Sequence, residues 1–246
     1  MPPSTVNQAL PKHGIHLREV SLVRGASTVF DGLSLELTEA RIGLIGDNGA
    51  GKSSLFRLIC GLDSPRAGRV EACGEPVNAE HPVVGRVGLM FQNADEQIIF
   101  PTVEEELALS LTATGVSRRV AVTQARDWLA ARGLADWAPR AVGSLSQGQR
   151  QYVCWLALVI AAPQVLLLDE PFASLDLPGQ ARLRSELARA SQQLLVSTHV
   201  LHHVSDYERV IWLDHGRVRA DGPGHEVCAV YEADVMARVA SGASVN

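Results

Sequence analysis

Apolar and polar residues alternate along two stretches near the start of the chain, Ile15 to Val23 and Val29 to Leu37. A period of two predicts two β-strands, and Asp31-Gly32 predicts a turn or a bulge between them. Four later stretches are continuously apolar, as is typical of parallel strands buried on both faces: residues 42–45, 87–91, 165–168 and 194–196. The pattern therefore predicts an α/β fold, with a mostly parallel sheet and a separate antiparallel β layer.

Apolar residues recur at helical spacing in the middle of the chain. Residues 103–140 predict helices separated by Gly115, and the spacing over 152–159 predicts a helix that opens at 145–149. This all-helical insert interrupts a strand-rich chain, so we expect residues 93–159 to form a subdomain. Further helices are expected over residues 178–190 and 226–240.

The composition is that of a globular protein, with 46% hydrophobic residues, 20% charged residues and a net charge of −5. The negative charge argues against a protein that coats nucleic acid. The four cysteines lack C-x-x-C spacing, so we expect reduced thiols in a cytosolic protein. No signal peptide is expected, and the longest apolar run, Tyr152 to Ala162, is shorter than the ~20 residues that span a bilayer. A membrane role must therefore come through a partner.

Residues 46–54 form a phosphate loop, with the pattern G-x-x-x-x-G-K-[ST] between an apolar run and a helical pattern. Its glycines allow successive N–H groups to surround phosphate oxygens, and the following helix points its positive end at the same anion. Lys52 is expected to reach the β- and γ-phosphates, and the Ser53 hydroxyl to bind Mg²⁺. The expected nucleotide-binding residues of the loop are Gly46, Asp47, Asn48, Gly49, Ala50, Gly51, Lys52, Ser53 and Ser54.

Other candidate residues lie at strand ends and at a helix start. Asp169 and Glu170 follow a continuously apolar run, where adjacent buried charges need a partner or a ligand. The carboxyl end of a parallel strand is also where such sheets bind ligands. Ser146 and Gly148 lie at the start of a predicted helix, which is a natural anion site. His199 follows another predicted core strand.

An acidic run, Glu104-Glu105-Glu106, follows Thr102 and has two interpretations. Thr102 and Glu105 have the spacing of a capping box, in which the two side chains satisfy backbone N–H groups at the helix start. The acids would then lie in the first helical turn, where the helix dipole favours negative charge. The run could instead be an acidic docking surface for a basic partner, and both interpretations can hold at once.

Together these motifs resemble the ATP-binding-cassette (ABC) ATPase family along nearly the whole chain. They stand in the family's order: the phosphate loop 46–53, Gln92, Leu145-Ser146-Gln147-Gly148-Gln149, Leu166-Leu167-Leu168-Asp169-Glu170-Pro171, Ser174-Leu175-Asp176 and His199. The resemblance implies ATP and Mg²⁺ as cofactors and a phosphate-loop, RecA-like core. It implies one domain over 1–246, made of a nucleotide-binding core with its β layer (14–92 and 160–225), a helical signature subdomain (93–159) and a short C-terminal helix and tail (226–246).

The resemblance also implies roles for the matched residues. Asp169 would hold Mg²⁺ through water, together with Ser53, and Gln92 would complete the site for the metal and the attacking water. Glu170 would be the general base for that water, and His199 would position the γ-phosphate. The nucleotide-binding set is completed by Ser146, Gly148 and Gln149, which would face the ATP of a second subunit in a head-to-tail dimer, and by Asp176.

Two positions depart from the family's pattern. Gln147 stands where glycine is common, and we expect activity to survive this change. Arg24 stands near the position of an aromatic residue that stacks on adenine, and because a guanidinium plane also stacks on bases, Arg24 is expected to hold adenine. His199, His202 and His203 could suggest a metal cluster, but neither Cys nor a further His stands at ligand spacing, so this alternative is not favoured.

Within the family, the lack of a second cassette or a long coiled-coil insert favours a transport motor over a soluble ATPase of DNA repair or translation. Residues 91–105 resemble the energy-coupling-factor (ECF) group of vitamin and metal importers, and Gln-Ile-Ile-Phe-Pro-Thr-Val most resembles the ATPase of biotin importers, ahead of cobalt and nickel importers. The resemblance implies a peripheral protein on the cytoplasmic face of the cell membrane. Its expected partners are a second ATPase subunit, a transmembrane coupling subunit docked near Gln92–Glu106 and, through it, a substrate-binding membrane subunit, with no nucleic acid.

Overall fold

Two β-sheets organise the computed structural model, which describes residues 14–241. The larger sheet has six strands in the order β10-β9-β3-β8-β7-β6 and is parallel except for β10, which pairs antiparallel with β9. Its strands are β3 (Arg41–Ile45), β6 (Val87–Met90), β7 (Val165–Asp169), β8 (Gln193–Ser197), β9 (Arg209–Asp214) and β10 (Arg217–Gly222). The predicted, mostly parallel sheet is confirmed.

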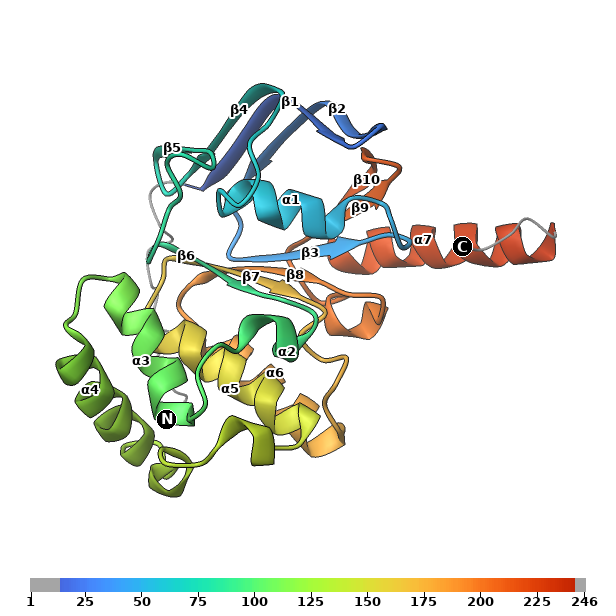
Figure 1. The fold of residues 1–246 in the computed structure, drawn as a ribbon. Helices are drawn as coiled ribbons and strands as arrows, with labels where there is room; N and C mark the ends of the chain where they lie inside the picture. Colours follow the sequence, from blue (N-terminus) through green and yellow to red (C-terminus); the bar gives the residue numbers. More distant parts are fainter. Residues whose placement is uncertain (1–13, 242–246) are drawn as a thin grey trace, which may run out of the picture.

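The smaller sheet has four antiparallel strands in the order β2-β1-β4-β5. They are β1 (Ile15–Arg24), β2 (Ser27–Leu37), β4 (Ala67–Ala72) and β5 (Glu75–Val77). The turn between β1 and β2 falls at Gly25-Ala26, whereas Gly32 lies inside β2 with a φ of +71°, beside a shift in strand register. Asp31-Gly32 is therefore a bulge and not the turn. In Figure 1 this sheet forms a layer above α1 (Lys52–Ile59), which lies between the two sheets.

The other helices cover the opposite face of the larger sheet and extend to one side of it (Figure 1). They are α2 (Ala94–Gln97), α3 (Val103–Ala113), α4 (Arg118–Ala130), α5 (Gln147–Ile160) and α6 (Leu177–Arg189), with short 3₁₀ turns at Ala135–Trp137, Val142–Ser144 and Leu201–His203. The last helix, α7 (Gly224–Ala240), runs outward from the edge that carries β9 and β10 (Figure 1). The helical insert predicted from apolar spacing is thus present. The short α2 was not predicted, because the Asn93 side chain that caps it is the main local signal.

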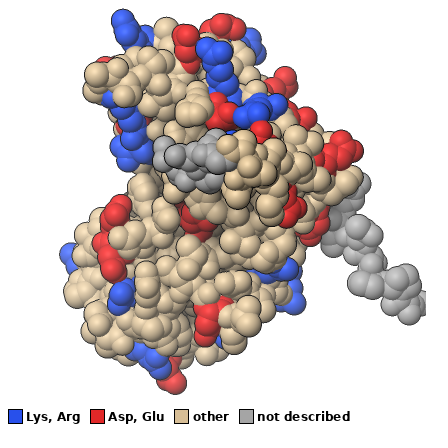
Figure 2. Space-filling view, turned by 90° about the vertical axis from the view of Figure 1, so that its right-hand side faces the viewer, with Lys and Arg blue, Asp and Glu red and all other residues tan. Residues whose placement is uncertain are grey.

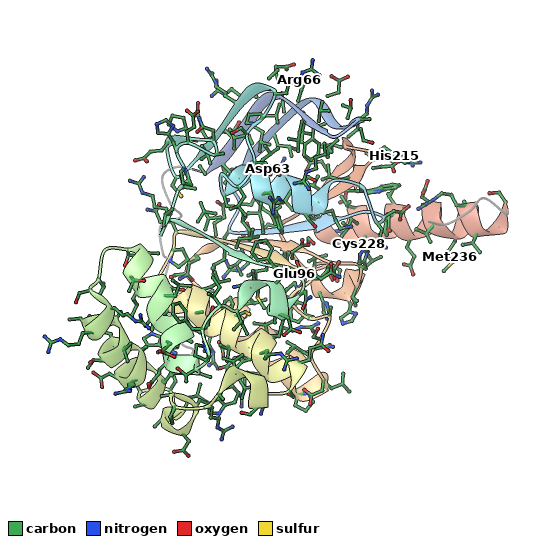
Figure 3. The ribbon with its side chains drawn as sticks, viewed as in Figure 1. Asp63, Arg66, Glu96, His215, Cys228 and Met236 are labelled. Carbon is green, nitrogen blue, oxygen red and sulfur yellow. The ribbon has the colours of Figure 1, made fainter. Side chains whose placement is uncertain are left out.

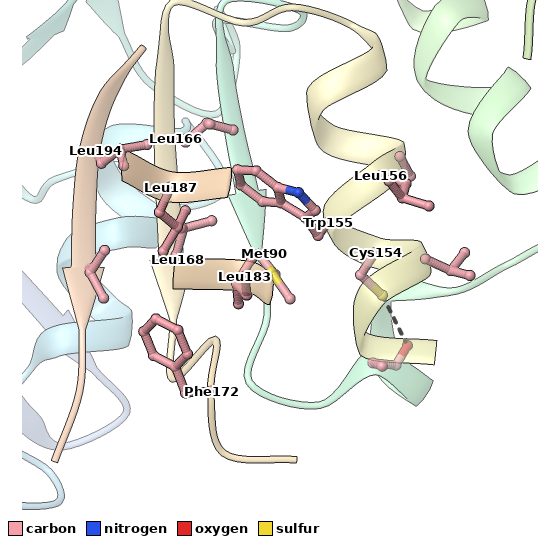
Figure 4. Packing of buried hydrophobic residues seen from close by; sticks show 14 of the residues in the cluster. Met90, Cys154, Trp155, Leu156, Leu166, Leu168, Phe172, Leu183, Leu187 and Leu194 are labelled. Carbon is pink, nitrogen blue, oxygen red and sulfur yellow. Dashed lines mark hydrogen bonds between the residues drawn. The ribbon is translucent and has the colours of Figure 1, made fainter. Parts of the chain in front are cut away.

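Side chains of the central strands alternate between two hydrophobic cores. In β7, Leu166 and Leu168 pack into the core under α5 and α6, whereas Val165 and Leu167 pack into the core shared with α1 and the smaller sheet. Figure 4 shows the first of these cores, in which Trp155 of α5 lies beside the strands. Burial on both faces explains why these strands are continuously apolar.

The capping box predicted at Thr102 and Glu105 is wrong. The Thr102 hydroxyl makes no cap bond and instead donates to the Glu105 carboxylate at 2.7 Å. The first two N–H groups of α3 donate to the carbonyl oxygens of Arg140 and Ala138, both at 3.1 Å. These acceptors come from a loop far along the chain and replace a local cap, so the local sequence did not indicate them.

Candidate functional site

The phosphate loop connects β3 to α1 in a conformation that excludes side chains at its first position. Gly46 has a φ of +144°, and a Cβ there would lie 2.1 Å from the carbonyl oxygen of Leu213. Lys52, the first residue of α1, is 8% exposed and donates to the carbonyl oxygens of Gly46 (2.6 Å) and Asp47 (3.1 Å). Burial lowers the pKa of Lys52, and nearby carboxylates oppose the shift. Lys12 and Lys52 are the only lysines of the sequence.

Asp169, at the end of β7, is fixed by two hydroxyl groups. Ser53 donates to one carboxylate oxygen at 2.6 Å, and Ser197 donates to the other at 2.5 Å. A hydroxyl and a carboxylate side by side, next to a phosphate loop, are the oxygen ligands that Mg²⁺ takes together with water and phosphate. Gln92, which follows β6, has an exposed side chain at the rim of the same cavity. Ser197 was not predicted, although its place at the end of β8, paired with Asp169, is a usable signal.

Glu170 is strained and buried. Its φ of +48° lies in the left-handed region, which is costly for a non-glycine residue and recurs at active sites. The side chain is 8% exposed, and its Oε1 lies 3.2 Å from Nε2 of His199 without forming a hydrogen bond to any described residue. Burial raises the pKa of Glu170, whereas burial and the charge of Lys52 lower the pKa of His199. The pair is therefore a carboxylate of increased basicity beside a neutral imidazole, which suits proton transfer from water.

These groups surround a cavity of about 190 Å³ at the carboxyl end of the larger sheet, which we call the phosphate-loop cavity. Its lining residues are Val29, Asn48, Gly49, Ala50, Gly51, Lys52, Ser53, Ser54, Gln92, Asp169, Glu170 and His199. The structure thus brings together most of the predicted set. Arg24 lies outside the lining, and its guanidinium binds Asp63, a residue labelled above α1 in Figure 3. Its stacking on adenine stays a prediction.

A second cavity, of about 440 Å³, lies where α5 and α6 begin, and we call it the signature cavity. Ser146 and Gln149 form a capping box, in which Ser146 Oγ accepts from the Gln149 N–H at 3.2 Å and Gln149 Oε1 accepts from the Ser146 N–H at 2.9 Å. Asp176 caps α6 through the Gly179 N–H at 2.9 Å. The lining residues are Trp137, Ser146, Gly148, Gln149, Tyr152, Ser174, Leu175, Asp176, Pro178, Gly179 and Arg182, none of which lines the phosphate-loop cavity.

The two helices of the signature cavity are tied together by one carboxylate. Glu186 of α6 accepts from the Tyr152 hydroxyl at 2.7 Å and from the Trp155 indole N–H, both on α5. At the helix starts, a Cβ on Gly148 would lie 3.2 Å from the carbonyl oxygen of Ser174. The signature residues on α5 and the residues that precede α6 therefore pack together and form one continuous surface.

The acidic run has a structural role inside the helical insert. Glu104 is 9% exposed and accepts two hydrogen bonds from Arg126 of α4, at 2.5 and 2.6 Å. Glu106 is 4% exposed and accepts the backbone N–H groups of Ile99 (2.9 Å) and Phe100 (2.8 Å). The interpretation as an acidic docking surface is therefore wrong for these two carboxylates, because they are turned inward and already paired.

Two further observations concern membranes and metals. No helix within residues 14–241 is long and apolar enough to cross a bilayer. In that same part of the chain, no group of three or more His, Cys, Asp and Glu side chains gathers as metal ligands would.

The His203 ring packs on Phe172, with ring centroids 4.0 Å apart, and on His202, at 4.2 Å. The cysteines at 60, 73, 154 and 228 are free thiols.

The sequence of the chain is similar to a known protein family and to several characterised proteins. Residues 30–173 match the family model described as ABC transporter. The chain is 44% identical over 230 residues to the biotin transport ATP-binding protein BioM of Rhodobacter capsulatus. The aligned residues make up 93% of this chain and 98% of that protein. A protein of the same name from Rhizobium etli is 36% identical over 207 residues, with 84% of this chain and 92% of that protein covered.

The fold is also found among solved structures. CbiO1 from Clostridium perfringens, described as part of the ABC transporter complex CbiONQ, superposes with a TM-score of 0.72 at 21% identity and covers 92% of this chain and 95% of that chain. This likeness confirms the predicted α/β fold with its parallel and antiparallel sheets. The family model matches more than half of the chain, and the relatives match nearly all of it. The chain therefore belongs to the ABC transporter family of ATP-binding proteins, which are ATPases coupled to transport.

Proposed function

We propose that this chain is the ATP-hydrolysing subunit of an ECF importer and that the importer takes up biotin. The observation that carries the proposal is the 44% identity, over 93% of the chain, to a protein named as a biotin transport ATP-binding protein. The segment between β6 and α3, which resembles the ECF group, supports the same assignment. The alternative, an importer of cobalt or nickel ions, is distinguished by the uptake test below.

The phosphate-loop cavity supports the hydrolytic chemistry residue by residue. Lys52 and the loop N–H groups would bind the β- and γ-phosphates of ATP. Ser53, Asp169 and Gln92 would hold Mg²⁺, which supplies charge neutralisation when bound. Glu170 would take a proton from the attacking water, and its raised pKa makes it a stronger base than an exposed carboxylate.

The separation of the two cavities supports a head-to-tail dimer. Ser146 and Gly148 line the signature cavity and not the phosphate-loop cavity of their own chain. In an antiparallel pair of chains, each signature cavity would cover the phosphate-loop cavity of the other chain. The helix N-terminus at Ser146 would then point at the γ-phosphate, which is the favourable direction for an anion.

An apolar groove beside α2 supports docking of a membrane subunit. The groove has a volume of about 510 Å³ and is lined by Asp95, Ile98, Ile99, Phe100, Pro101, Val142, Gly143 and Arg150. Ile99 is 73% exposed and stands with Ile98, Phe100 and Pro101 in one apolar segment of the lining. We assign the docking site of the transmembrane coupling subunit to this groove and no longer to the carboxylates of the acidic run. Docking there would hold the chain on the cytoplasmic face of the membrane.

Uptake by reconstituted vesicles tests the proposed substrate. The chain is purified with its membrane partners from the native host, and the complex is placed in vesicles that contain ATP. We expect ATP-dependent uptake of biotin, and no uptake in matched vesicles made with Glu170→Gln. Uptake of cobalt or nickel ions without biotin would contradict the biotin assignment and keep the importer assignment.

Docking is tested separately by Ile99→Asp. This change puts a charge into the apolar groove, so we expect it to reduce recovery of the chain with membranes while ATP affinity stays unchanged. Val120→Asp is the matched control, because Val120 is also an exposed apolar residue, at 42%, on α4 outside the groove. Equal membrane recovery of both variants would contradict docking at this groove.

A further inference from the structure

The phosphate loop contains an acid that its chemistry does not need. Asp47 directly follows Gly46, and a carboxylate so close to a bound triphosphate would repel it. In the structure this carboxylate is turned to α7, where it accepts from the Tyr231 hydroxyl at 2.7 Å and from Arg238 Nη1 at 2.6 Å. Asp47 does not line the phosphate-loop cavity. The prediction that Asp47 binds the nucleotide therefore concerns its backbone N–H group and stays a prediction.

The two donors are held in place by other residues of the same region. Arg238 also donates to Asp234 at 2.8 Å, one turn earlier on α7, and Asp234 accepts from Arg219 of β10 at 2.7 Å. The ring of Tyr231 packs edge-on against Trp212 of β9, with centroids 5.2 Å apart. Figure 2 looks toward the side from which α7 extends and shows acidic and basic side chains interspersed there. The helix is therefore anchored to the sheet and to the phosphate loop at once.

The contact to Asp47 reaches the phosphate-binding lysine through the backbone. The carbonyl oxygen of Asp47 accepts from the Lys52 ammonium at 3.1 Å, so the main chain at Asp47 helps to position that group. The hydrogen bond from Arg238 is also the main cause that lowers the pKa of Asp47, whose carboxylate is ionised at neutral pH. The loop thus carries a permanent negative charge, and a cation from α7 neutralises it.

We propose that Arg238 and Tyr231 are positioning residues of the nucleotide site. They neutralise the Asp47 carboxylate and hold it away from the triphosphate, so that the phosphate loop presents its N–H groups and Lys52 to ATP. The C-terminal helix is then part of the ATP-binding apparatus, and any displacement of α7 weakens ATP binding. The proposal rests on ATP binding by the chain and is independent of the transported substrate.

The test is the dissociation constant of ATP, measured by calorimetry with Mg²⁺ on the full chain, in a double-mutant design. Arg238→Ala leaves the Asp47 charge unneutralised, and we expect ATP to bind about tenfold more weakly, as for one partly screened charge interaction. In an Asp47→Asn background the loop charge is gone, so Arg238→Ala should change the dissociation constant by less than about twofold. Equal losses in both backgrounds would overturn the proposal, because they would indicate only a structural role.

Two further variants separate the proposal from a general loss of packing. Arg209→Ala removes ion pairs to Glu39 and Asp221 without touching Asp47 or α7, and should leave ATP affinity unchanged even where it lowers the melting temperature. Tyr231→Phe keeps the ring against Trp212 and removes one hydrogen bond, so it should weaken ATP binding by roughly twofold to fivefold. Unchanged ATP affinity in both Tyr231→Phe and Arg238→Ala would overturn the proposal, and wild type without ATP binding would overturn the assignment on which it rests.

Discussion

The phosphate-loop cavity and the signature cavity differ in how they are built. The first collects residues from β2, the loop after β3, α1, the end of β7 and the segments that follow β6, β7 and β8, and it holds a strained, buried carboxylate at Glu170. The second is made by the starts of α5 and α6, where Ser146 and Asp176 satisfy the helix N–H groups locally. The first cavity contains buried charge and a strained backbone, whereas the second is lined by helix starts whose N–H groups are capped by local side chains.

This difference indicates that the two cavities serve different purposes, one chemistry and the other recognition. Strain and buried charge cost stability and persist where chemistry needs them, whereas a well-capped surface is suited to recognition. In the proposed head-to-tail pair, the signature cavity of each chain would cover the phosphate-loop cavity of its partner. Three experiments break or sharpen this comparison.

The largest effect is expected from Glu170→Gln. Loss of the general base should lower ATP hydrolysis on the order of 10²-fold or more, while ATP binding is retained. Glu170 is buried and its pKa is raised, so ionised Glu170 destabilises the fold at neutral pH and the neutral amide should increase the melting temperature. Turnover and thermal unfolding are measured together. The matched control is Glu80→Gln on an exposed turn, and near-normal turnover of Glu170→Gln would disprove the assigned role.

Mixing two inactive variants tests whether the cavities complete each other between chains. Glu170→Gln disables the phosphate-loop cavity, and Ser146→Arg fills the signature cavity with a bulky charge. Random pairing places one intact composite site in half of the dimers, so the mixture should recover about a quarter of the wild-type ATPase rate, provided that one site works alone. The control is each variant assayed alone at the same total concentration. If hydrolysis used both cavities of one chain, no mixture could restore it.

The smallest effect concerns the two helix caps. Ser146→Ala removes a cap that the structure contains and should lower the free energy of unfolding by about 1 kcal/mol. Thr102→Ala removes a side chain that caps nothing and should change it by less than about 0.5 kcal/mol. Urea unfolding without nucleotide compares both with wild type. The opposite ranking would show that the local cap at α3 matters more than the loop carbonyls that contact it.

The sequence was sufficient where a short segment determines the chemistry. The phosphate loop, Asp169, Glu170 and His199 could be predicted because each directly follows a core strand, and parallel strands end at one edge of a sheet. The sheet itself followed from continuously apolar runs. Gln92 could be placed only through the family resemblance, since a single glutamine after a strand does not by itself indicate a chemical role.

The sequence was insufficient where the partner of a side chain lies far along the chain. Glu104 and Glu106 formed part of an acidic run, yet each is bound inside the insert by Arg126 or by backbone N–H groups. Asp47 belonged to a phosphate loop, yet its carboxylate binds a helix almost at the end of the chain. In each case a tertiary contact decided which way the charge faces, and the local pattern carried no signal for it.

The phosphate-loop lysine offers a chemical handle on this protein. Because all other cations of the described chain are arginines or histidines, an amine-selective acylating reagent finds a side-chain target there only at Lys52. Burial lowers the pKa of this amine, which makes it more nucleophilic at neutral pH than a surface lysine and also hides it from bulky reagents. The extent of labelling at Lys52, separated from that at Lys12 by peptide mass, would therefore report whether the nucleotide site is open or filled.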